Sequence, residues 1–147
     1  MLLGGMTMFG KQLEKNGLYF YFVFRVFVGL LFALHGAQKL FGWFGGMDSK
    51  GGSVALFSLM GLAGVVEFFG GLLVAVGLLA RLAALLGVVQ MLAAYFMAHA
   101  SKGLVPLAVG GNGGELALLY FASFLVILAY GAGLWGLEKE LFKKEWF

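Results

Sequence analysis

The 147-residue chain contains no cysteine and one proline, and only 12% of its residues are charged. The absence of cysteine excludes disulfides, thiolate metal sites and dithiol redox chemistry within the chain. Soluble domains carry about 25% charged residues, whereas this chain is 62% hydrophobic. It is therefore predicted to be an integral membrane protein that partners the lipid bilayer. The net charge of +3 lies mostly near the chain ends, so nucleic-acid binding is not indicated.

Four apolar stretches of the chain match the length that a helix needs to cross a bilayer, which is about 20 residues. They cover residues 18–40, 54–79, 82–100 and 114–134. The fold class predicted from them is all-α, a four-helix transmembrane bundle that runs up, down, up and down. It forms a single transmembrane domain over residues 1–147, with an interfacial lead before residue 18 and a charged, amphipathic tail at residues 138–147.

Basic residues are distributed unequally between the two sides of this predicted bundle. The side of the termini carries six: Lys11, Lys15, Arg81, Lys139, Lys143 and Lys144. The opposite side carries three: Lys39, Lys50 and Lys102. Because cytoplasmic loops are enriched in Lys and Arg, both termini are predicted to be cytoplasmic, in a multi-pass protein of the plasma membrane.

Small residues are concentrated in the second apolar stretch. It contains glycines at positions 61, 64, 70, 71 and 77. Glycine lets the backbones of membrane helices approach closely. We therefore expect one face of this helix to pack tightly against a neighbouring helix.

Seven polar side chains lie in or at the edges of the apolar stretches, where an ionisable group needs a partner or a polar cavity. They are Arg25, His35, Lys39, Glu67, Gln90, His99 and Glu115. We predict that they form an intramembrane polar or ligand-binding site. At a rise of about 1.5 Å per residue, the deep group near the midplane is Arg25, Glu67 and Gln90. The other four fall near the outer surface.

The deep group suggests an ion pair between Arg25 and Glu67, since a guanidinium can meet a carboxylate with two hydrogen bonds. Such a pair would serve either packing or function. Lys39 is expected to extend to the lipid headgroups. Gln90 and His99 are nine residues apart, so they point to opposite faces of a straight helix unless that helix bends or ends before His99.

Glu115 follows Asn112 and two glycines, which predicts a place in the first turn of the last span. There the helix dipole favours a carboxylate, and Asn112 could cap the helix. A sharper hypothesis makes Glu115 the partner of His99, His35 or Lys39.

No catalytic residue and no metal site are identified, because local ligand motifs such as HxxxH or ExxH are missing. Two histidines on facing helices, His35 and His99, would suit a quinone oxygen or a haem iron, and quinone is the favoured cofactor. Tyr95, Tyr120 and Tyr130 could line a pocket, although aromatic residues on membrane helices more often pack.

Six sequence elements follow one another in a characteristic order. They are Arg25, LHGAQKLFG at 34–42, VEFFGGLLVAVGLLAR at 66–81, HASKG at 99–103, NGGELALLY at 112–120 and GAGLWGLEK at 131–139. Together they resemble the DoxX family over nearly the whole chain. The family pattern falls on Arg25, His35, Lys39, Glu67, Arg81, His99 and Glu115. The chain departs from it at Ala80, where relatives often have threonine, and at residues 133–135, near where proline and Arg-Tyr are usual.

The resemblance implies a four-helix transmembrane bundle and an association with redox metabolism. Founding relatives are described as small subunits of quinone-linked membrane oxidoreductases, including thiosulfate:quinone oxidoreductase. Another relative is linked to a membrane complex with superoxide dismutase and a thiol sulfurtransferase. The resemblance therefore favours a quinone-linked membrane subunit, as an oxidoreductase component with a redox protein partner. The alternatives are a transporter-like binding protein for a small solute and a non-catalytic assembly or partner subunit. Homo-oligomers are compatible with each.

Overall fold

The computed structural model describes residues 8–103, 105–107 and 109–144, so the first seven residues of the predicted lead and the last three of the tail lie outside it. Its helices are α1 (Met8–Lys15), α2 (Gly17–Phe41), α3 (Leu59–Val76), α4 (Ala80–Ala94), α5 (Glu115–Tyr130) and α6 (Leu137–Phe142). Short helical turns follow α2 at Trp43–Gly45 and α4 at Tyr95–His99 and Ala100–Lys102. The described residues contain no strand, which confirms the all-α prediction.

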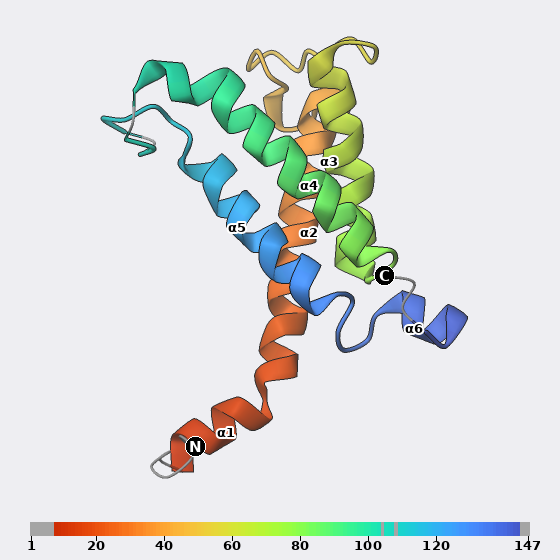
Figure 1. Ribbon diagram of the computed structural model, residues 1–147. Helices are drawn as coiled ribbons and strands as arrows, with labels where there is room; N and C mark the ends of the chain where they lie inside the picture. Colours follow the sequence, from red (N-terminus) through yellow and green to blue (C-terminus); the bar gives the residue numbers. More distant parts are fainter. Residues whose placement is uncertain (1–7, 104, 108, 145–147) are drawn as a thin grey trace.

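The helices are arranged as two pairs (Figure 1). α2 and α3 run side by side, and α4 with α5 crosses them at an angle. α1, the α3–α4 turn and α6 lie toward one end of the bundle, whereas the loops at residues 42–58 and 103–114 lie at the other. Successive long helices therefore alternate in direction.

Within the described residues, three helical stretches are long and apolar enough to cross a membrane: Gly17–Phe41, Leu59–Val76 and Ala80–Lys102. α5 is apolar but has 16 residues, which span about 24 Å and fall short of a hydrocarbon core of about 30 Å. The predicted fourth span was too long, because Gly131 ends the helix with a φ of 69°.

The predicted second span began too early. Residues 54–58 are not helical, and α3 begins only after Ser58. The Ser58 hydroxyl accepts a hydrogen bond from the Gly61 N–H at 3.0 Å. A serine that supplies this bond marks a helix N-terminus. The late start moves every residue of α3 toward the end that carries the loop at residues 42–58, which was predicted to be the outer end.

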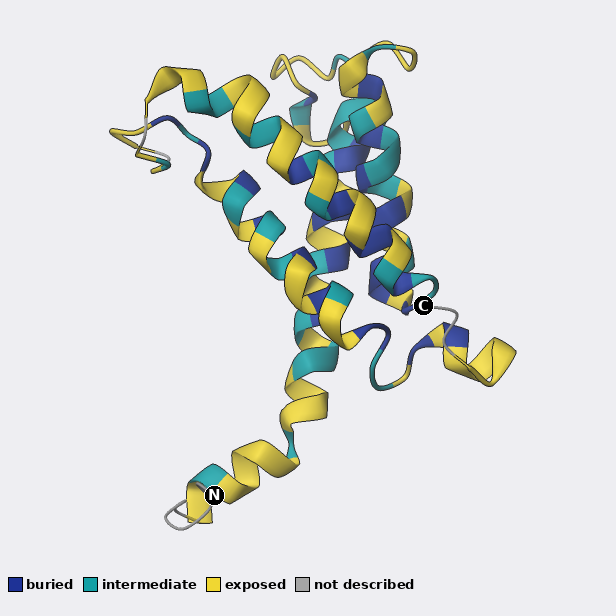
Figure 2. Cartoon of the chain, in the orientation of Figure 1, coloured by how far each residue is buried: buried dark blue, intermediate teal, exposed yellow. Residues whose placement is uncertain are grey.

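The outward faces of the helices are exposed (Figure 2), and many of the exposed residues are large and apolar. Phe27 of α2, Val89 of α4 and Leu119 of α5 are each more than half exposed. Soluble monomers rarely expose extended apolar surface. Together with the three long apolar stretches, these faces identify an integral membrane protein in contact with lipid.

α2 and α3 approach each other closely at two pairs of glycines spaced seven residues apart. A Cβ on Gly29 would lie 2.6 Å from the Gly71 carbonyl oxygen, and one on Gly36 would lie 2.7 Å from the Gly64 oxygen. No side chain fits at such distances, so glycine permits the contact. The residue numbers of each pair add up to 100, which defines the antiparallel register. The predicted packing face is thus confirmed at Gly64 and Gly71.

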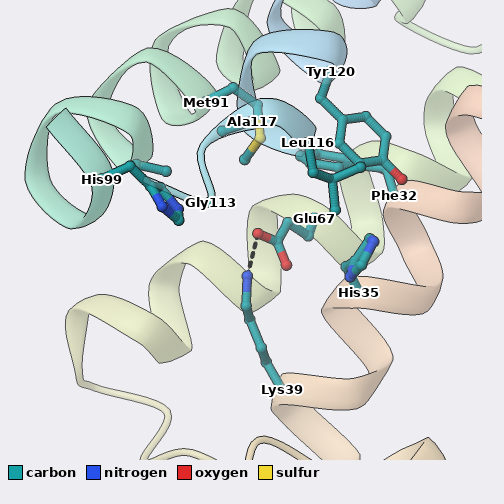
Figure 3. Close-up of a pocket in the computed structure, with 11 residues that line it drawn as sticks. Phe32, His35, Lys39, Glu67, Met91, His99, Gly113, Leu116, Ala117 and Tyr120 are labelled. Carbon is teal, nitrogen blue, oxygen red and sulfur yellow. Dashed lines mark hydrogen bonds and ion pairs between the residues drawn. The ribbon is translucent and has the colours of Figure 1, made fainter. Parts of the chain in front are cut away.

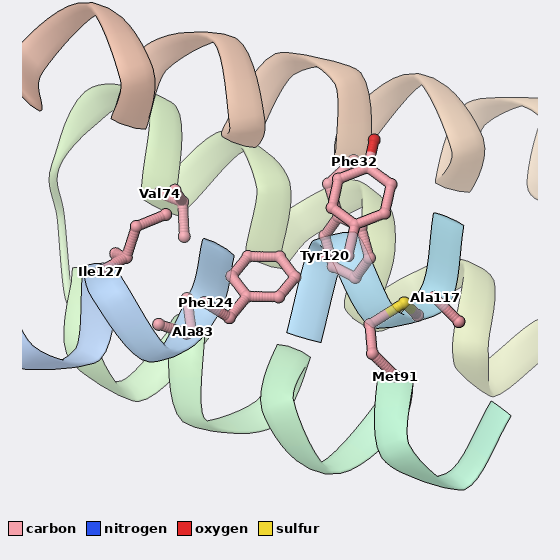
Figure 4. Close-up of a cluster of buried hydrophobic side chains, with 9 residues drawn as sticks. Phe32, Val74, Ala83, Met91, Ala117, Tyr120, Phe124 and Ile127 are labelled. Carbon is pink, nitrogen blue, oxygen red and sulfur yellow. The ribbon is translucent and has the colours of Figure 1, made fainter. Parts of the chain in front are cut away.

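A cluster of buried apolar side chains joins the two helix pairs (Figure 4). Phe124 of α5 is fully buried, and its ring centroid lies 4.7 Å from that of Phe32 of α2. A Cβ on Gly87 of α4 would lie 2.6 Å from the Phe124 ring, so α4 and α5 are also in close contact. The full cluster comprises Phe32, Val74, Ala83, Ala84, Met91, Ala117, Tyr120, Phe124 and Ile127.

Arg25 is fully buried at the C-terminal end of α3. Its Nη1 donates to the carbonyl oxygens of Val74 at 2.5 Å and Ala75 at 2.8 Å, and its Nη2 donates to Leu134 at 3.5 Å. The last carbonyls of a helix lack partners within it, and the helix dipole favours a cation there. The predicted pairing of Arg25 with Glu67 is therefore wrong. The register sets Arg25 opposite Ala75, about 12 Å along α3 from Glu67.

Glu138 plays the complementary role at the start of α4. It is 3% exposed, and its Oε2 accepts from the Leu79 N–H at 3.1 Å. Its own N–H donates to the Gly77 carbonyl at 3.0 Å. A carboxylate at a helix N-terminus is stabilised by the helix dipole. One residue of the predicted charged tail, Glu138, is thus buried and binds the α3–α4 turn, whereas residues 139–144 are exposed.

Substituting Gly71 with alanine should destabilise the protein, because the new methyl group would force α2 and α3 apart. Overpacking of this kind typically costs about 1–3 kcal/mol. The neighbouring variant Gly70→Ala is a matched control, since a Cβ there would meet nothing within 4 Å. Thermal unfolding in one detergent, followed by circular dichroism, should show a lower midpoint for Gly71→Ala alone. Equal midpoints would contradict the close helix contact.

Candidate functional site

A cavity of about 260 Å³, here called the polar chamber, lies among α2, α3, α4 and α5 (Figure 3). Its lining combines polar groups with apolar walls and comprises Phe32, His35, Lys39, Glu67, Met91, Ala94, His99, Gly113, Leu116, Ala117 and Tyr120. Four of the seven predicted site residues therefore line one cavity: His35, Lys39, Glu67 and His99.

An ion pair between Lys39 and Glu67 crosses the chamber from α2 to α3 (Figure 3). The Lys39 Nζ donates to Glu67 Oε1, and the two side chains are 16% and 3% exposed. The expectation that Lys39 extends to the headgroups is therefore wrong. Because α3 begins at Leu59, Glu67 lies nearer the outer end than its predicted depth and comes within reach of Lys39. The sequence feature that could have predicted this later helix start is Ser58, because serine is favoured as a helix N-cap.

Gln90 of α4 donates a hydrogen bond to the same carboxylate. Its Nε2 donates to Glu67 Oε1 at 2.7 Å and to the Ala63 carbonyl at 3.3 Å. The predicted proximity of Glu67 and Gln90 is confirmed. Glu67 Oε2, by contrast, is buried and has no hydrogen-bond partner among the described residues. A buried acceptor without a partner is unfavourable, so this oxygen marks a place for a donor from a ligand or a water.

His35 and Tyr120 form the side of the chamber between α2 and α5. Their rings meet edge to face, with centroids 5.8 Å apart and an interplanar angle of 87°. Neither side chain makes a hydrogen bond to the rest of the described chain. Both keep their polar atoms available to a ligand, and Tyr120 adds a hydroxyl to the site.

His99 reaches the chamber from the π-helical turn Tyr95–His99. Its Nδ1 lies 3.0 Å from the Asn112 carbonyl oxygen. A carbonyl only accepts, so Nδ1 carries the proton and Nε2 keeps a free lone pair. Gln90 and His99 were expected to point to opposite faces only if the helix were straight, and here it is not. The π-helical turn contains one extra residue and rotates His99 toward the chamber.

Asn112 holds the loop that follows His99. It is 4% exposed, its Oδ1 accepts from the Gly114 N–H at 2.8 Å, and its Nδ2 donates to the Gly103 carbonyl at 2.8 Å. Asn112 thus closes the loop at both ends and orders the approach to α5, where Gly114 precedes the first helical residue. The predicted helix cap is wrong, because the N-cap residue of α5 is Gly114 and Asn112 accepts a hydrogen bond from its N–H instead of from the first helical turn.

Three of the predicted site residues lie outside the chamber lining, and one of them, Gln90, still contacts it through Glu67. Arg25 caps α3 at the opposite end of the bundle. Glu115 is the first residue of α5, as predicted, but it is exposed and does not line the cavity. Among the described residues, no group of three or more His, Asp or Glu is placed to hold a metal ion.

Comparisons with known proteins give a family and one relative. A sequence model of the DoxX family matches residues 20–100, which include most of α2 and all of α3 and α4. A Haemophilus influenzae protein, described as an uncharacterized protein, is 42% identical over 137 residues, which cover 91% of this chain and 99% of that protein. No solved structure matches the chain.

Replacing Lys39 with methionine should destabilise the protein, because Glu67 would keep a buried charge without its cation. Removing one partner of a buried ion pair costs about 3–5 kcal/mol. The double variant Lys39→Met/Glu67→Gln, which removes both charges, should recover much of this loss. Lys50→Met in the exposed outer loop is the control. Thermal midpoints measure the effect, and a double variant no more stable than Lys39→Met would argue against the pair.

Proposed function

Because the chain belongs to the DoxX family, we propose that it is a quinone-linked redox subunit of the plasma membrane whose polar chamber binds the quinone headgroup. One observation carries this proposal. The unpartnered Oε2 of Glu67 is buried beside a cavity that also presents Lys39, His35 and Tyr120. Polar groups gathered within a membrane bundle point to a ligand site.

The dimensions and chemistry of the chamber suit a single ring with polar substituents. Its volume of about 260 Å³ lies just below the range of roughly 300–1,000 Å³ found for drug-sized ligands. Phe32, Met91 and Leu116 supply apolar walls for the faces of a ring. Lys39 and Tyr120 supply donors for its oxygen atoms, since an ammonium has three protons and Glu67 takes one of them.

A quinone would bring the capacity to accept two electrons and two protons, and a redox protein partner would supply the electrons. The chain's own residues would bind the headgroup and exchange protons with it. His35 is the group that we assign to proton exchange, because histidine gains and loses a proton near neutral pH. Tyr120 would orient the headgroup, and Lys39 would keep Glu67 in its ionised form.

The topology that we propose has four crossings and cytoplasmic termini, with α5 as a short fourth span. Lys39 lies within the chamber, so the outer loops retain two basic residues, Lys50 and Lys102. The six at the opposite end are unchanged, and this stronger asymmetry supports the proposed orientation.

The chain is suited to a topology test because it has no native cysteine. We expect Lys50→Cys to react with a membrane-impermeant maleimide in intact cells, and Glu140→Cys in α6 to react only after the cells are opened. Both positions are exposed. Labelling is read by a shift in gel mobility. The reverse pattern would overturn the orientation, and labelling of both sites in intact cells would overturn the three proposed crossings between residues 50 and 140.

Tyr120→Phe should weaken the binding of ubiquinone-1 roughly fivefold, which corresponds to one lost hydrogen bond of about 1 kcal/mol. The thermal midpoint should stay the same, because the hydroxyl has no partner in the described chain. Tyr130→Phe is the matched control, since Tyr130 is 66% exposed and does not line the chamber. Isothermal titration calorimetry on the detergent-purified protein measures both variants.

These titrations, together with an uptake assay and a test for copurifying proteins, distinguish the alternative functions. Unchanged ubiquinone-1 binding in Tyr120→Phe would place the quinone elsewhere. If ubiquinone-1 does not bind but liposomes containing the protein take up a polar solute, a transporter-like role replaces the quinone role. If neither occurs and a cofactor-bearing protein copurifies, the chain is a non-catalytic partner subunit.

A further inference from the structure

We infer that the polar chamber selects a ligand that donates hydrogen bonds, so that it binds a quinol more tightly than the corresponding quinone. This inference rests on the proposed function and specifies which form of the ligand the site prefers. It follows from the contacts that hold the polar atoms of the chamber in their donor or acceptor roles.

Glu67 is held as an acceptor. Its Oε1 receives hydrogen bonds from Lys39 and Gln90, so this oxygen is occupied, and the adjacent Lys39 ammonium favours the ionised carboxylate. The other oxygen, Oε2, is buried, and no described group donates to it. An ionised carboxylate can only accept hydrogen bonds. A ligand that satisfies Oε2 must therefore donate a hydrogen bond to it.

His99 is held as an acceptor by a different contact. Its Nδ1 donates to the Asn112 carbonyl, and Asn112 is itself anchored to Gly103 and Gly114. With Nδ1 protonated, Nε2 of the neutral ring can only accept. Exchanging the roles of the two ring nitrogens would break the hydrogen bond to the Asn112 carbonyl.

The remaining polar groups of the chamber do not oppose this preference. Tyr120 and His35 make no hydrogen bond to the described chain, so either one can donate or accept. Lys39 can still donate hydrogen bonds to a ligand oxygen. Because the oxygen of a carbonyl and the oxygen of a hydroxyl both accept hydrogen bonds, Lys39 does not discriminate between quinone and quinol. A quinol hydroxyl therefore suits Lys39 and Glu67 together, whereas a quinone carbonyl suits Lys39 and leaves Glu67 Oε2 without a partner.

A ligand without donors should bind at least about tenfold more weakly, because a hydrogen bond to a charged acceptor contributes more than one between neutral groups. A tenfold preference for the reduced form raises the midpoint potential of the bound couple by about 30 mV, since two electrons are transferred.

The experiment compares ubiquinone-1 with chemically reduced ubiquinol-1, titrated under argon into the full-length protein in detergent. We expect ubiquinol-1 to bind at least about tenfold more tightly to the wild-type chain. In Lys39→Met/Glu67→Gln the preference should fall, because the amide can turn its NH₂ toward the ligand, and only the part set by His99 should remain. His99→Phe provides an independent variant that leaves the ion pair intact, and its preference should also fall. Tyr130→Phe should keep the wild-type ratio.

Each outcome separates this inference from the proposed function on which it rests. Equal affinities, or tighter binding of ubiquinone-1, would overturn the donor preference and leave the quinone site standing. Binding of neither form would overturn the proposed function itself. A wild-type preference that persists in both folded variants, as judged by thermal midpoints, would show that Glu67 and His99 do not set it.

Discussion

The close contact between α2 and α3 determines where the other parts of this protein lie. Gly29 against Gly71 and Gly36 against Gly64 allow two backbones to touch, and a touching pair of helices can adopt one register only. That register places Arg25 at the last carbonyls of α3. It also places Lys39 one or two turns from Glu67, within reach of its long side chain. The register of one helix pair thus gives Arg25 and Lys39 different partners: backbone carbonyls for Arg25 and the Glu67 carboxylate for Lys39.

The buried charges serve two separate tasks at the two ends of the bundle. At the end with the α3–α4 turn, Arg25 and Glu138 bind the free backbone groups where α3 stops and α4 starts. Both side chains are nearly or fully buried, and both form hydrogen bonds to the main chain. Toward the other end, Lys39 and Glu67 bind each other, and Glu67 Oε2 is left without a partner among the described residues. Buried polar atoms without a described partner occur at both ends, since Arg25 Nε and Gln90 Oε1 also have none, but Glu67 Oε2 belongs to a side chain that lines a cavity.

Irregular backbone shapes the chamber. The π-helical turn before His99 changes the direction of a side chain that a regular α-helix would point elsewhere. Turns of this kind occur frequently at functional sites in other proteins. The loop beyond it is closed by Asn112, whose side chain bonds to Gly103 and Gly114. The short α5 then starts beside the chamber and contributes Tyr120.

The membrane class, the all-α fold, the glycine packing face and most of the polar groups that line the chamber could be predicted from the sequence. These properties depend on composition and helical periodicity, which are local. The tertiary structure alone decided that Lys39 rather than Arg25 binds Glu67, that His99 turns inward and that Glu138 is buried. These outcomes depend on helix register, on a helix start shifted by five residues, and on one extra residue in a turn. A shift of five residues moves a side chain by about 7 Å, which is enough to exchange one partner for another.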